Sequence, residues 1–185
     1  METPELLVVD AAAWRQWLEQ HGQTAPGVWL VLAKKGAVDP TSLSYDQALE
    51  EALCFGWIDS QLAKRDAVTF HQRFTPRKPR SPWSMRNTSL VTELLAQGRM
   101  HEAGIREIER AKADGRWDAA YAGQSSIEVP VVVALALAAN LEAAERFNAL
   151  KRSDRYSILY RLSQAKRPET RARHITNAIA ALSSP

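Results

Sequence analysis

The spacing of apolar residues predicts helices alternating with short strands in the first two thirds of the chain. Trp14, Trp17 and Leu18 recur at helical spacing behind Asp10, a residue suited to capping a helix. The expected elements up to residue 121 are helices over 10–20, 44–55, 84–97 and 103–113, and strands over 28–34, 57–61 and 68–74. Gly98 and Gly104 are interpreted as helix stops.

The predicted strands are expected to form one small antiparallel sheet. The strands over 57–61 and 68–74 are joined by a short connection around Asp66, which favours a hairpin. The strand over 28–34 is expected to lie beside this hairpin. Helices packed on one face of such a sheet make an α+β fold.

Beyond residue 121 every predicted element is helical. Asn140 is expected to cap one of these helices, Ser153 another, and Pro168 to open the last. This change predicts an α+β core domain over residues 1–121 and a helical C-terminal subdomain over residues 122–185. The most apolar run, 129–139, is too short to cross a bilayer, so no membrane span is expected.

Composition narrows the possible chemistry and location. The single cysteine among 185 residues, Cys54, excludes an intramolecular disulfide and a multi-cysteine zinc site. The four histidines are scattered, and no nucleotide-binding glycine loop is present, so neither a metal nor a cofactor is expected. The N-terminus lacks the basic start and apolar core of a signal peptide, which predicts a cytoplasmic location.

The net charge of +3 is divided into blocks of opposite sign. Residues 1–63 carry −6, residues 64–87 carry +6, residues 88–145 carry −4 and residues 146–185 carry +7. Either the basic blocks attract anions, including nucleic acid without sequence preference, or they are solvated surfaces. The basic residues of the last block are Arg146, Lys151, Arg152, Arg155, Arg161, Lys166, Arg167, Arg171 and Arg173.

The strongest candidate for a binding site is the arginine-rich segment that follows the predicted hairpin. Arginine forks match phosphate and carboxylate oxygens, and tryptophan can stack on a ring. The alternative is a proline-stiffened loop that pairs with the acidic surface of its own domain. The expected ligand-binding residues are Trp57, Asp59, Arg73, Arg77, Arg80, Ser81, Trp83, Ser84 and Asn87.

Five motifs resemble the YdeI/OmpD-associated family, also called bacteriocin-protection proteins. They are ALCFGWIDSQ (52–61), RFTPRKPRSPWSMRN (73–87), QGRMHEAG (97–104), AKADGRW (111–117) and YRLSQAKRPETRARHI (160–175). This resemblance extends over nearly the whole chain. It implies a role in tolerance of bacteriocins or envelope stress, and it carries no established catalytic mechanism.

Two further residues are candidates for catalysis. Cys54 would be a nucleophile if a base lowered the pKa of its thiol, but its apolar neighbours favour a packing role. Asp59 would be a general base in a cleft, or would pair with Arg73 or Arg77 across the hairpin.

Together these observations favour a binding module for a small anionic ligand, a nucleotide-like molecule or an acidic protein segment. Its cleft is expected between the strand over 57–61, the arginine-rich segment and the helix after Ser84. The alternatives are an enzyme that uses Asp59 or Cys54 in the same cleft, and a nucleic-acid or protein-partner adaptor that acts through the two basic blocks. The sequence does not predict an oligomeric state.

Overall fold

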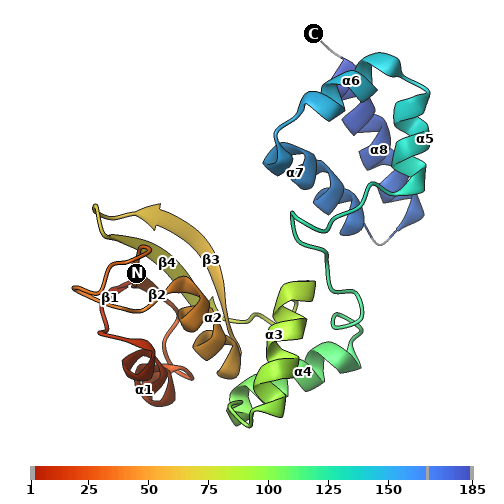
Figure 1. Cartoon of the computed structure of the whole chain (residues 1–185). Helices are drawn as coiled ribbons and strands as arrows, with labels where there is room; N and C mark the ends of the chain where they lie inside the picture. Colours follow the sequence, from red (N-terminus) through yellow and green to blue (C-terminus); the bar gives the residue numbers. More distant parts are fainter. Residues whose placement is uncertain (1–2, 166, 184–185) are drawn as a thin grey trace. The chain divides into compact units, whose positions relative to one another are not determined.

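The computed structural model of the chain describes residues 3–165 and 167–183 and has an α+β fold (Figure 1). The chain divides into two compact units, Met1–Ala120 and Tyr121–Pro185. Of the basic residues predicted for the last charge block, Lys166 lies outside the described residues.

The N-terminal unit contains a four-stranded sheet with the strand order β1-β2-β4-β3. Its elements are β1 (Glu5–Leu6), α1 (Ala11–His21), β2 (Val28–Ala33), α2 (Tyr45–Cys54), β3 (Trp57–Lys64), β4 (Thr69–Pro76), α3 (Met85–Ala96) and α4 (Glu102–Ala113). The predicted hairpin is confirmed as β3 and β4, and β2 pairs antiparallel with β4 as expected. The sheet is nevertheless mixed, because β1 adds to β2 in parallel.

One face of the sheet carries the core of the N-terminal unit. Leu30 on β2, Phe74 on β4 and Trp57 on β3 are fully buried together with Trp14 of α1. The indole N–H of Trp14 donates to the carbonyl oxygen of Ala48 over 3.1 Å, which joins α1 to α2. Strand residues of the opposite parity lie on the other face of the sheet, as the period of two requires.

Local signals in the sequence set several helix ends. Asp10 caps α1, and Ser44 and Gln47 form the predicted capping box of α2. Gly98 has a φ of 67° just after α3, which confirms the predicted stop. Gly104 does not stop a helix: it lies inside α4, where an added Cβ would collide with the backbone of Cys54.

The C-terminal unit contains four helices among its described residues. Its elements are α5 (Val131–Ala138), α6 (Leu141–Ala149), α7 (Arg152–Ser163) and α8 (Pro168–Ser183). Its own apolar cluster is centred on Phe147 and Leu159. Asn140 caps α6 and Pro168 opens α8 as predicted, whereas α7 begins at Arg152, so the prediction that Ser153 caps it was wrong.

Among the described residues, no helix combines the length and the apolar character needed to cross a membrane.

Candidate functional site

The arginine-rich segment after β4 folds back onto the N-terminal unit around a buried cation. The guanidinium carbon of Arg77 lies 3.6 Å from the ring centroid of Trp83, and its Nη1 donates to the carbonyl oxygen of Pro82 over 3.1 Å. Arg77 is 5% exposed and Trp83 is 1% exposed. Trp83 also packs against the ring of Trp117. This segment therefore holds a positive charge in a region of reduced dielectric.

Three hydrogen bonds, all accepted by Ser81 or Ser84, close the segment. Ser81 Oγ accepts from the backbone N–H of Lys78 over 3.0 Å, and the Ser81 carbonyl accepts from Arg116 Nη1 over 2.8 Å. Ser84 caps α3 by accepting from the N–H of Asn87, whose side chain is buried. Arg80 remains exposed on the outer side of this loop.

Two of the predicted ligand-binding residues face the core side of β3. Trp57 is fully buried and meets the stacked rings of Trp14 and Trp17 edge-on. Its indole N–H donates to the carbonyl oxygen of Gly22 over 2.8 Å. Asp59 accepts a hydrogen bond of 2.9 Å from the hydroxyl of Tyr45. The structure thus separates these two side chains from the residues that line the pocket described next.

A pocket of about 660 Å³ lies where β3, β4 and the arginine-rich segment meet. It contains three of the predicted ligand-binding residues, Arg73, Arg77 and Ser81, together with Lys78. Its remaining lining residues are Pro26, Ile58, Ser60, Thr75, Pro76 and Pro79. The lining therefore carries three cationic side chains and no carboxylate. We call this hollow the arginine pocket.

Arg73 reaches the arginine pocket from the centre of the sheet. It lies opposite Trp29 in the β2–β4 register, and its Nη2 donates to Thr3 Oγ1 over 3.2 Å. Its Nε is buried and has no hydrogen-bond acceptor within the described part of the chain. An arginine held in this way keeps donors available for an anion.

Cys54 lies at the end of α2, next to a network of ion pairs that the sequence did not predict. Buried Glu51 accepts from Arg15 Nη1 over 2.8 Å and from Arg99 Nη2 over 2.5 Å. Burial, followed by the charge of Glu51, raises the pKa of the Cys54 thiol to about 11. The thiol is therefore protonated at neutral pH, and a protonated thiol is a poor nucleophile.

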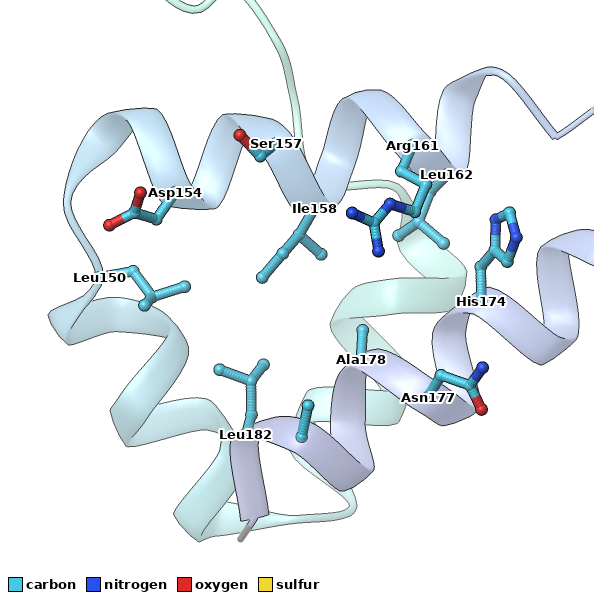
Figure 2. A pocket seen from close by; sticks show the side chains of 11 residues that line it. Leu150, Asp154, Ser157, Ile158, Arg161, Leu162, His174, Asn177, Ala178 and Leu182 are labelled. Atoms are coloured by element: carbon cyan, nitrogen blue, oxygen red, sulfur yellow. The ribbon is translucent and has the colours of Figure 1, made fainter. Parts of the chain in front are cut away.

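The C-terminal unit has a pocket of about 490 Å³ between α7 and α8 (Figure 2). Aliphatic side chains from both helices and from Leu150 point into it, and Arg161 and His174 lie at one end. A second hollow of about 610 Å³ shares Ser157, Arg161 and His174 with the first and is also lined by Tyr156 and Tyr160. We call the first of these the α7–α8 pocket.

Sequence reasoning missed the α7–α8 pocket. It included Arg161 only in the last basic block, and it assigned no role to His174. The helical spacing of Ile158, Leu162, Ala178 and Leu182 indicates a buried face. Periodicity alone does not distinguish a filled interface from one that encloses a pocket, so the pocket could not be predicted.

Within residues 3–165 and 167–183, histidine, cysteine and acidic side chains form no group of three that would hold a metal ion.

Two family models match different parts of the chain. Residues 6–107, more than half of the chain, match the family described as "Domain of unknown function (DUF8412)". Residues 126–184 match the family described as "Bacteriocin-protection, YdeI or OmpD-Associated", which confirms the predicted resemblance for this part of the chain. The motifs at 52–61, 73–87 and 97–104 lie in the first match. No curated protein and no solved structure matches the chain.

Proposed function

We propose that this chain, which belongs to the family described as a domain of unknown function (DUF8412), is a binding protein that holds a small anion in the arginine pocket. The observation that carries this proposal is the lining of the pocket, in which three cationic side chains are accompanied by no carboxylate. A volume of about 660 Å³ suits a ligand of metabolite size.

The three cations have different roles in this proposal. Arg77 supplies a fixed positive charge, because its stacking on Trp83 and its burial hold the guanidinium in place. Arg73 offers the buried Nε donor to a phosphate or carboxylate oxygen. Lys78 is exposed on the loop and contributes a mobile point charge at the rim. The favoured ligands are thus small phosphorylated or carboxylated molecules.

The proposed process is tolerance of bacteriocins. It is supported by the description of the family that residues 126–184 match. In this proposal the protein acts in the cytoplasm by binding an anionic small molecule, without turnover, and the arginine pocket is the site of that binding.

A thermal-shift screen of the full chain against pyrophosphate, citrate, nucleoside monophosphates and sugar phosphates tests the arginine pocket. An anion at a hundred times its Kd should stabilise the protein by about 2.7 kcal/mol. Arg73→Gln removes one lining charge and should weaken binding by at least tenfold, because hydrogen bonds to charged groups contribute about 1.5–3 kcal/mol.

The matched control is Lys64→Gln, which removes an exposed charge from β3 outside the pocket. It should leave the affinity of any bound anion within a factor of two. The proposal fails if no anion shifts the wild-type melting temperature, or if Arg73→Gln retains the wild-type shift.

A further inference from the structure

We propose that the α7–α8 pocket is a second binding site, and that its ligand is a small monocarboxylate with an aliphatic tail. The site lies wholly within the C-terminal unit and shares no residue with the arginine pocket. The protein would therefore bind a second ligand at this site, and this proposal does not depend on the function proposed above.

The inner surface of the α7–α8 pocket matches an alkyl tail. Ile158 on α7, Leu182 on α8 and Leu150 before α7 point toward one another across the hollow (Figure 2). Ala178 and Ala181 also line it, and their small side chains leave room for a ligand. Burying methylene groups against these side chains is favourable by about 0.8 kcal/mol each, which is roughly fourfold in affinity per methylene.

One end of the pocket matches a carboxylate. The guanidinium of Arg161 points into the hollow between Ile158 and Leu162, and the imidazole of His174 lies at the same end, beyond Leu162 (Figure 2). Among the described residues, none forms an ion pair or a hydrogen bond with the side chain of Arg161. His174 Nδ1 is buried and has no partner in the same part of the chain. Both groups are therefore available to a bound carboxylate, which arginine binds with two parallel hydrogen bonds.

The opposite end of the pocket limits the ligand to a single negative charge. Asp154 lies seven residues before Arg161 on α7, a separation of about 10 Å along the helix axis. The two side chains lie on different sides of the hollow, so Asp154 does not neutralise Arg161 (Figure 2). A second carboxylate at the far end of the ligand would be repelled by Asp154, whereas an uncharged alkyl end would not.

Titration of the ¹⁵N-labelled full chain with sodium octanoate tests this site, with octan-1-ol and butanoate as matched ligands. Octanoate should shift the amide signals of α7 and α8 and bind at least tenfold more tightly than either comparison ligand. Octan-1-ol has the same tail without the charge, and butanoate has the charge with four fewer methylenes.

Three variants locate the binding. Arg161→Gln should weaken octanoate at least tenfold, whereas Arg173→Gln, an exposed position on α8 outside the pocket, should change it less than twofold. Ala178→Phe should fill the hollow and abolish binding. Circular dichroism checks that each variant keeps its helices. If Ala178→Phe does not fold, Arg161→Gln alone tests the proposal, because Arg161 is exposed and its replacement should not disturb the fold.

The proposal is overturned if octan-1-ol binds as tightly as octanoate, if butanoate does so, or if Arg161→Gln binds like the wild type. Arg73→Gln should retain full octanoate binding, so failure of the arginine pocket and failure of this site are separate outcomes.

Discussion

Cys54 shows how burial changes the chemistry of one side chain. The thiol is fully buried at the end of α2, and the carboxylate of Glu51 is close enough to disfavour a thiolate further. Two arginines neutralise Glu51, but desolvation remains the largest influence on the cysteine. The residue therefore acts as a small apolar group in the core at neutral pH.

The raised pKa of Cys54 predicts a loss of stability in alkaline solution. In the unfolded chain the thiol loses its proton near pH 8.5–9, whereas in the folded chain it keeps the proton up to about pH 11. Between these values the folded state binds more protons than the unfolded state, so the free energy of unfolding falls as the pH rises. The full window, about 2 to 2.5 pKa units, corresponds to about 3 kcal/mol.

Urea unfolding at pH 8 and pH 10.5, for the wild type and Cys54→Ala, measures this effect. Titration of the other groups is common to both proteins, so the wild type should lose more stability than the variant over this interval. Equal losses would show that the thiol titrates alike in both states.

Whether a predicted binding residue lies in the core or lines a pocket depends on its burial, and only part of this burial could be predicted from the sequence. A tryptophan next to arginines is equally consistent with a ligand wall and with a core side chain, since both need apolar surface. The indole N–H of Trp57 finds its acceptor in Gly22, 35 residues away, and this contact is invisible in the local pattern. Arg73 was predictable as a pocket residue because strand alternation placed it opposite the core face.

At the scale of elements, α4 packs closely against the end of α2 at Gly104. A Cβ added there would lie 2.2 Å from the carbonyl oxygen of Cys54 and 2.8 Å from its carbonyl carbon. These are backbone atoms, which do not move aside as a flexible side chain would.

Gly104→Ala should therefore destabilise the N-terminal unit by roughly 1–3 kcal/mol, the usual cost of overpacking, although alanine favours a helix over glycine. The control is Gly123→Ala, where an added Cβ meets nothing within 4 Å and the free energy of unfolding should change by less than about 0.5 kcal/mol. Urea midpoints measure both. An unchanged midpoint for Gly104→Ala would mean that the two helices can separate at little cost.

Elements with strong local signals were predictable, and those defined by tertiary pairing were not. The capping box at Ser44 and the proline that opens α8 determine helix ends through contacts within one turn. Strand β1 has only two residues, too few for any periodicity, and its parallel pairing with β2 exists only in the folded sheet. The mixed character of the sheet was therefore beyond the reach of the sequence pattern.

At the scale of the whole molecule, each compact unit has its own apolar cluster. All six tryptophans lie between residues 14 and 117, so tryptophan fluorescence reports on the N-terminal unit alone. Circular dichroism at 222 nm reports on the helices of both units.

Phe147→Ala should destabilise the C-terminal unit by about 3–5 kcal/mol, because the side chain is 2% exposed and its removal leaves a cavity. The urea midpoint followed by fluorescence should stay unchanged, while part of the dichroism signal is lost at lower urea. A parallel shift of both signals would show that the two units unfold as one cooperative system.

The strand order β1-β2-β4-β3 has a consequence for the growing chain on the ribosome. Strand β2 ends at Ala33, and its antiparallel partner β4 begins only at Thr69, 36 residues later. At a synthesis rate of about 5–20 residues per second, roughly 2–7 s pass between the end of β2 and the start of β4. During that interval Leu30 and Leu32 have no completed sheet to cover them, so the nascent chain offers chaperones a short, strongly apolar segment.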